Sequence, residues 1–178
     1  MTRYAAFLRA INVGGHVVKM DALRRHFAAL GLAHVETYIA SGNVVFDSRA
    51  RAAGALERRI AAHLRRALGY EVATFLRTTT ELAEVAGHRP FSEDPGTVLY
   101  IGFLPRPLDA AERRLVLGLR PPDDEFALRP RELFWLSRTR FSDAEFSPAK
   151  MEKALGLPAT FRGANTVRKM AERYGAPG

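Results

Sequence analysis

The order of apolar and polar stretches in the first half of the chain predicts an α+β unit. Strands are expected over residues 4–11, 34–40, 43–47 and 72–77, because each is a short apolar run bounded by turn-forming residues. Helices are expected between them, where apolar residues recur with a period near 3.6. The resulting order, β-α-β-β-α-β, is that of a ferredoxin-like unit. The two helices carry these apolar residues: Met20, Leu23, Phe27 and Leu30 in the first, and Ala53, Leu56, Ile60, Leu64 and Ala67 in the second.

The second half repeats the same order of elements. Strands are expected over residues 97–104, 125–129, 132–137 and 158–162, with helices starting near Asp109 and near Ser147-Pro148. The helix near Asp109 is expected to carry Leu108, Leu115 and Leu119 on its apolar face. A terminal helix follows, capped by Asn165 or Thr166 and carrying Val167, Met170 and Tyr174. The fold class is therefore α+β, with two ferredoxin-like units in tandem, a connecting helix and a C-terminal helix.

The expected boundaries follow from where the repeated pattern starts and stops. Residues 1–77 form the first unit, residues 78–96 a connector helix and loop, and residues 97–178 the second unit with the C-terminal helix. The connector helix is indicated by Thr78 and Glu81, which have the spacing of a capping box. Its expected apolar contacts are Leu82 and Val85.

Composition narrows the class of protein. The chain has 178 residues, 47% of them apolar, and no cysteine, so it is expected to fold without disulfides, a thiol nucleophile or a thiolate metal site. No apolar run approaches the roughly 18–20 residues of a membrane-spanning helix, and the N-terminus lacks the apolar core of a signal peptide. A soluble cytoplasmic protein with no membrane partner is the expectation.

The net charge of +8 has two explanations that the sequence leaves open. Clustered Lys and Arg attract the phosphates of nucleic acid. Arginine, however, supplies 23 of the 27 basic residues in a chain rich in Ala and Gly, as a biased base composition would also produce. The charge is spread over both halves of the chain and no block of five like charges occurs, which favours the compositional explanation over a dedicated nucleic-acid surface.

Two polar turns of the first unit are expected to meet. In a ferredoxin-like sheet, with strand order 4-1-3-2, the end of the first strand lies beside the start of the third. This topology brings the turn after the first strand, with its successive glycine amides, next to the turn before the third. Glycine amides can cradle an anion, and an arginine fork suits phosphate or carboxylate. The candidate ligand-binding residues are Arg9, Asn12, Gly14, Gly15, Ser41, Gly42 and Asn43. The competing explanation is that these residues only turn the chain.

Other candidates for chemistry are explained as structure. The five histidines lack metal-ligand spacing, so no metal site is expected, and His16 is expected to be solvated in its loop. Asp123-Asp124-Glu125 follows two prolines and is interpreted as a solvated turn. Phe7 and Phe46 are assigned to the core, because the RNA-binding RNP1 pattern is absent. Trp135 is assigned to the core or to the seam between the two units.

Three motifs of the chain resemble an uncharacterised family, the domain of unknown function 1697. They are Tyr4 to Gly15 (YAAFLRAINVGG), Met20-x-x-Leu23-Arg24 and Tyr38 to Phe46 (YIASGNVVF). The resemblance covers nearly the whole chain and implies a two-part α+β protein, but no activity. Members tend to have R-N-x-N-T-V near the C-terminus, where this chain has Gly163 in place of the first asparagine and so lacks the amide side chain at that position. Asn165 and Thr166 remain candidate contributors to the ligand site.

Three functions are compatible with these observations. The first is binding of a phosphate- or carboxylate-bearing small molecule at the end of the first sheet. The second is a nucleic-acid-binding module that uses a basic surface. The third is an interaction or scaffold domain without a small-molecule site. The sequence assigns no catalytic residue, cofactor or oligomeric state, and it leaves open whether the protein is an enzyme.

Overall fold

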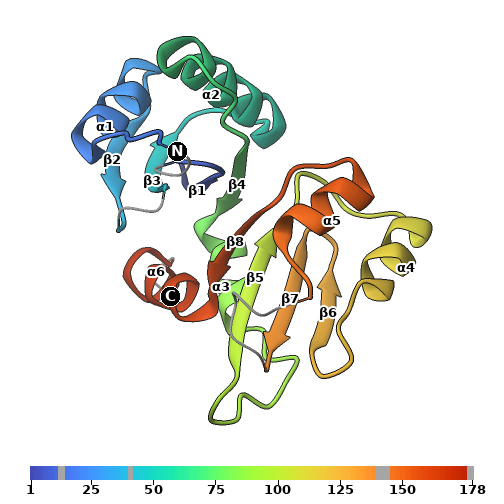
Figure 1. Cartoon of the computed structure of the whole chain (residues 1–178). Helices are drawn as coiled ribbons and strands as arrows, with labels where there is room; N and C mark the ends of the chain where they lie inside the picture. The colour runs from blue at the N-terminus through green and yellow to red at the C-terminus, as the bar shows by residue number, and fades with distance from the viewer. Residues whose placement is uncertain (12–14, 40–41, 139–144, 176–178) are drawn as a thin grey trace. The chain divides into compact units, whose positions relative to one another are not determined.

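The computed structural model describes residues 1–11, 15–39, 42–138 and 145–175. These residues form two four-stranded antiparallel sheets and six helices (Figure 1). The chain divides into two compact units, Met1–Val85 with Met170–Gly178, and Ala86–Lys169.

The first sheet contains the strands expected from the first half of the sequence, in the order β2-β3-β1-β4. β1 is central, and it pairs antiparallel with β3 on one side and β4 on the other. The order agrees with the sequence-based expectation that the first and third strands are neighbours. The elements up to β4 are β1 (Thr2–Leu8), α1 (Met20–Ala29), β2 (Ala33–Thr37), β3 (Asn43–Ser48), α2 (Ala53–Leu68) and β4 (Thr74–Thr78).

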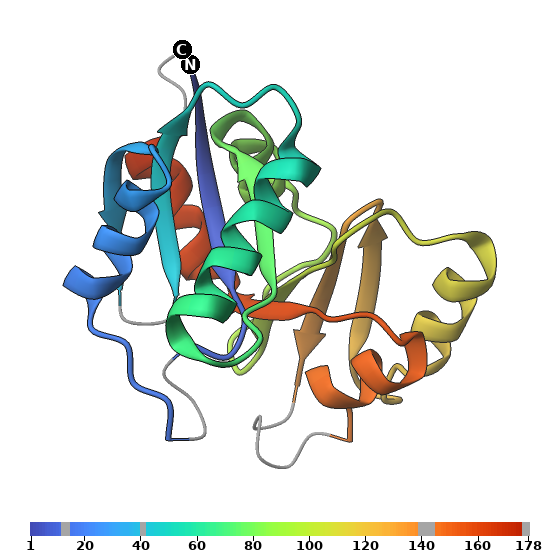
Figure 2. The same cartoon turned by 90° about the horizontal axis from the view of Figure 1, so that it is seen from above.

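Both faces of the central strand are buried. Tyr4, Ala6 and Leu8 pack with α1 and α2 in one apolar cluster, and the helices cover this face of the sheet (Figure 2). Ala5 and Phe7, which alternate with them, are fully buried on the other face. This two-sided burial explains why all five residues of β1 from Tyr4 to Leu8 are apolar. The helix residues of the cluster are Leu23 and Phe27 from α1, and Leu56, Ile60 and Leu64 from α2.

The connector helix begins with the capping box expected from the sequence. The Thr78 backbone N–H donates to Glu81 Oε2 (2.8 Å), and the Glu81 N–H donates to Thr78 Oγ1 (3.1 Å). α3 (Thr79–Gly87) follows, and its Leu82 and Val85 are buried, as expected.

The second sheet has the order β6-β7-β5-β8, so its strands follow the same plan as the first. β5 takes the place of β1, and its partners β7 and β8 are antiparallel to it. The order of elements from β1 to α3 is thus repeated from β5 to α6. The elements are β5 (Val98–Phe103), α4 (Ala110–Gly118), β6 (Glu125–Arg129), β7 (Glu132–Ser137), α5 (Pro148–Leu155), β8 (Thr160–Gly163) and α6 (Ala164–Tyr174).

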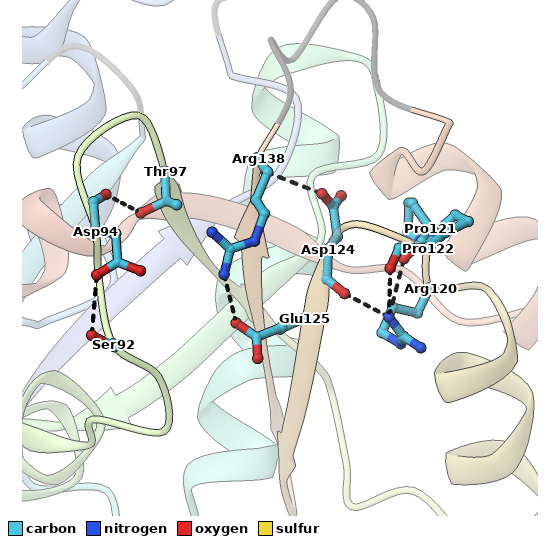
Figure 3. Close-up of polar contacts among 9 residues, drawn as sticks. All are labelled: Ser92, Asp94, Thr97, Arg120, Pro121, Pro122, Asp124, Glu125 and Arg138. Carbon is cyan, nitrogen blue, oxygen red and sulfur yellow. Dashed lines mark hydrogen bonds and ion pairs between the residues drawn. The ribbon is translucent and has the colours of Figure 1, made fainter.

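Trp135 lies at the centre of the second core, fully buried among Phe146, Phe161 and Tyr100. Its indole Nε1–H donates to Asp124 Oδ2 at 2.8 Å. The other Asp124 oxygen accepts from the Arg138 backbone N–H at 3.0 Å (Figure 3). The expectation that Asp124 belongs to a solvated turn was therefore wrong. This carboxylate is 1% exposed because it satisfies two donors that the fold brings to it.

Two further expectations about helices are corrected. Leu115 was assigned to the buried stripe of α4, but it is 45% exposed, and the adjacent Val116 is buried in its place. α6 begins at Ala164, so Asn165 and Thr166 lie inside its first turn and do not cap it. Val167, Met170 and Tyr174 are buried as expected.

Candidate functional site

The two polar turns of the first unit meet at one end of the first sheet. Phe7 pairs with Asn43, and the Leu8 N–H donates to the Gly42 carbonyl at 2.8 Å. Gly42 has φ +79°, and a Cβ built on it would lie 3.1 Å from the Leu8 carbonyl oxygen and 3.2 Å from Ile11 Cβ. The close approach of the two backbones therefore requires glycine here. Among the sequence-based candidates, Asn12, Gly14 and Ser41 lie outside the described residues.

Arg9 lies where β1 passes from the sheet into its loop. Its backbone N–H donates to the Ala73 carbonyl at 2.9 Å, which ties the loop to the residue just before β4. The Arg9 side chain is half-buried. Arg9 is thus held between the Gly42 turn on one side of β1 and the start of β4 on the other.

The loop before β4 adds one aromatic ring, that of Tyr70, which sequence reasoning did not assign to this end of the sheet. His16 stacks on Tyr70 with ring centroids 3.9 Å apart, so the expectation of a merely solvated His16 was incomplete. The Tyr70 hydroxyl is buried without a hydrogen-bond partner in the described part of the chain. The position of Tyr70 could have been predicted, because β4 is antiparallel to β1 and the loop before β4 must therefore lie at the end of the sheet where β1 ends.

Asn43 is used by the fold itself. Its side chain is fully buried, and Nδ2 donates to the Tyr38 carbonyl at 3.0 Å. The Asn43 carbonyl in turn accepts from the Tyr38 N–H at 2.9 Å. These two bonds close the connection between β2 and β3, so the Asn43 amide has a structural function in the hairpin.

Both loops at this edge contain a non-glycine residue with positive φ. Ala10 has φ +65° and Ile39 has φ +47°, a costly conformation for a β-branched residue. Ile39 is also 54% exposed, and Val17 in the loop before α1 is 82% exposed. Gly15, with φ +83°, has open space around it. This end of the first sheet thus combines strained backbone, exposed apolar side chains and an arginine.

The corresponding end of the second sheet has an equivalent backbone hydrogen bond, made by different residues. The Leu104 N–H donates to the Arg131 carbonyl at 2.9 Å, in the place of the Leu8–Gly42 bond. Pro105 and Pro107 follow Leu104, so this loop lacks the glycine amides of the first unit. The candidate site is therefore a feature of the first unit.

Asn165 and Thr166 lie in the second unit, at the start of α6. Asn165 is exposed and lines a pocket of about 170 Å³ with Glu93, Thr97 and Gly163. The Arg168 guanidinium donates two hydrogen bonds to Glu93, at 2.8 and 2.7 Å, and this fork lowers the pKa of the Glu93 carboxyl. Asp94 accepts hydrogen bonds from Ser92 and Thr97 and shapes the loop before β5 (Figure 3).

A larger pocket, of about 470 Å³, lies at the opposite end of the first sheet, where β3 ends. Its acidic residue, Asp47, accepts from Arg3 Nη1 at 2.9 Å and lies 2.7 Å from His34 Nδ1. Partial burial acts to raise the pKa of Asp47, but the contacts with Arg3 and His34 outweigh it and hold the pKa below its usual value. This carboxylate is occupied by its protein partners.

The described residues contain no cluster of three or more His, Asp or Glu side chains able to hold a metal ion. Within the same residues, no helix has the length and apolar character needed to cross a membrane.

Comparisons with known proteins agree with the motifs and with the fold. A search of curated proteins found no match. The solved structure of the conserved bacterial protein SP0830 from Streptococcus pneumoniae resembles this chain with a TM-score of 0.75 and 27% identity, over 96% of this chain and 97% of that one. The family model described as "Protein of unknown function (DUF1697)" matches residues 1–134, which confirms the resemblance carried by the N-terminal motifs. The chain therefore belongs to the DUF1697 family of proteins of unknown function.

Proposed function

We propose that the protein binds an anionic small molecule, bearing phosphate or carboxylate, at the end of the first sheet. The observation that carries the proposal is the junction of the two loops at Leu8 and Gly42, with Arg9 beside it. Arg9 supplies a planar cation that suits two oxygens of one anion. The expected ligand-binding residues of the first unit are Arg9, Asn12, Gly14, Gly15, Ser41, Gly42 and Asn43.

Backbone amides supply the second part of the site. Gly15 is exposed, has positive φ and has open space beside its Cα, so a ligand can approach this backbone closely. Asn43 contributes by holding the hairpin, since its Nδ2 is bonded to Tyr38. The Tyr70 hydroxyl, buried beside the His16 ring, is a further group able to bond a ligand or a bridging water.

The fold supplies the rigid frame. We propose that both units are ferredoxin-like, because each sheet has the 2-3-1-4 strand order and each repeats β-α-β-β-α-β. Residues 1–77 are then the unit that carries the site, residues 78–96 the connector, and residues 97–178 the second unit with its C-terminal helix. A contribution of Asn165 and Thr166 to the site remains a prediction from the sequence.

The proposal is tested by thermal shift and isothermal titration with inorganic pyrophosphate, nucleotides, sugar phosphates and small carboxylates. A ligand present at 100 times its Kd stabilises the folded state by about 2.7 kcal/mol. For a chain of this length the expected rise in Tm is about 5–11 °C. Arg9→Ala is expected to abolish the rise, measured against the variant's own unliganded Tm.

Arg25→Ala is the matched control. Arg25 is also in the first unit and is exposed on α1, so its removal changes the net charge equally without touching the proposed site. If no anion shifts the Tm of the natural protein, or if Arg9→Ala responds like Arg25→Ala, the proposed site is wrong.

A further inference from the structure

Helix α2 presents an arginine-rich face to solvent. Arg58 and Arg65 are seven residues apart, and so are Arg59 and Arg66, which gives two rows about 10.5 Å long at the 1.5 Å rise of an α-helix. Arg51 lies two residues before the helix and adds a fifth arginine to this end of α2. All five side chains are exposed. We call these five residues the arginine face.

The opposite side of α2 is buried in the core of the first unit. Leu56, Ile60 and Leu64 are at most 2% exposed and pack against the first sheet. Ala61 and Ala62 are the small residues that separate the arginines. They leave a hollow of about 520 Å³, which is also lined by Arg58, Arg65, Arg66 and Glu71.

Few of these cations are neutralised by the protein. Arg65 forms an exposed ion pair with Glu71 at 3.1 Å, and Arg59 donates to the Leu30 carbonyl. In the described part of the chain, Arg51, Arg58 and Arg66 have no ion pair with a carboxylate. Burial is the main cause that lowers the pKa of His63 on the same helix, and the charges of His26 and Arg66 lower it further.

We infer that the arginine face binds the phosphate backbone of nucleic acid. Its four helical arginines, from Arg58 to Arg66, extend for about 12 Å along α2, longer than a single phosphate requires, and Arg51 adds a further cation before the helix. Each guanidinium group can bind two oxygens of one phosphate. Several arginines spaced along the helix therefore suit a polymer that carries regularly spaced phosphates. The exposed large apolar side chains of the described residues include no aromatic ring, so no base-stacking platform accompanies the face, and binding is independent of sequence.

A membrane surface fits this face less well. An interfacial helix inserts an apolar face between lipids, whereas the apolar face of α2 is buried in the core. The inference involves none of the residues proposed for the small-anion site, so each can fail without the other.

The test is fluorescence anisotropy with labelled 20-base oligonucleotides of two sequences, single- and double-stranded, at 50 to 200 mM salt. Contacts with four or five phosphates give a slope of log K against log salt of about −4, and so a few hundred-fold loss of affinity over this range. Replacing Arg58, Arg65 and Arg66 with Gln removes three contacts. The expected slope is then shallower by about 2.7, with only about a sixfold loss of affinity over the same range.

A second triple variant controls for overall charge. Arg113→Gln, Arg114→Gln and Lys153→Gln remove the same charge from α4 and α5 of the second unit, and should leave affinity and slope near those of the natural protein. Equal weakening by the two triple variants would show bulk charge attraction and overturn the inference. So would the absence of binding at 50 mM salt, or binding to anionic-lipid vesicles in place of the oligonucleotides. Arg9→Ala is expected to bind the oligonucleotides normally.

Discussion

Replacing Gly42 with alanine tests the junction of the two loops. Two costs are expected. An L-residue at φ +79° costs about 1–2 kcal/mol. The new Cβ also meets the Leu8 carbonyl oxygen at 3.1 Å, and Leu8 Cβ and Ile11 Cβ at 3.2 Å each, closer than most such contacts. Because one neighbour is backbone in a central strand, the second cost is that of overpacking, about 1–3 kcal/mol. The expected total is about 2–5 kcal/mol.

Gly31→Ala separates the two terms. Gly31 has the same φ, +79°, but a Cβ there meets nothing within 4 Å, so only the conformational cost of about 1–2 kcal/mol applies. Free energies of unfolding come from urea titrations followed by far-UV circular dichroism. Exchange of the Leu8 amide hydrogen, which bonds the Gly42 carbonyl, should also become faster in Gly42→Ala. If Gly42→Ala costs no more than Gly31→Ala, the close approach of the two loops is refuted.

Three further predictions concern buried and paired ionisable groups. Asp124→Ala leaves the Trp135 indole and the Arg138 backbone N–H without their acceptor, so the free energy of unfolding should fall by about 3 kcal/mol. Urea unfolding followed by Trp135 fluorescence measures it, and a fall below about 1 kcal/mol would contradict the buried hydrogen bonds. Burial and nearby positive charge lower the pKa of His63, so the unfolded chain binds more protons than the folded protein and the free energy of unfolding should fall as the pH drops below about 6.5. His63→Gln should reduce the stability lost between pH 7.5 and 5.5. If the variant loses as much stability as the natural protein over this range, His63 is not the cause. The two hydrogen bonds from Arg168 lower the pKa of Glu93, so this ion pair stabilises the fold above about pH 4.5, and the stabilisation is lost as the pH falls through the pKa of Glu93 in the folded protein. Arg168→Gln should raise the pKa of Glu93 in an NMR titration. An unshifted pKa would contradict the pairing.

The elements were predictable where the signal is local. β6 and β7 have the bounds expected from the sequence, and α5 begins with a Ser147 side chain that accepts from the Lys150 N–H, as the Ser-Pro pair indicated. The strand order of the first sheet was also predictable, because the connections of a β-α-β-β-α-β unit leave few alternatives.

The errors arose where distant partners decide the outcome. Asp124 looks like a turn residue until Trp135, eleven positions later, places its indole N–H beside the carboxylate. Leu115 and Val116 both fit a helical period, and only packing selects the valine. Of the candidate site, the topology predicted the meeting of the two loops, but it could not show that the Asn43 amide is bonded to Tyr38 or that His16 stacks on Tyr70.

The most direct test of an anion site at the end of the first sheet is an NMR titration of the ¹⁵N-labelled protein with inorganic pyrophosphate. The amide signals of Arg9, Gly15, His16 and Gly42 should shift in a saturable manner, and these shifts should disappear in Arg9→Ala and persist in Arg25→Ala. Shifts confined to the arginine face of α2, or the same shifts at these four amides in Arg9→Ala, would contradict the site.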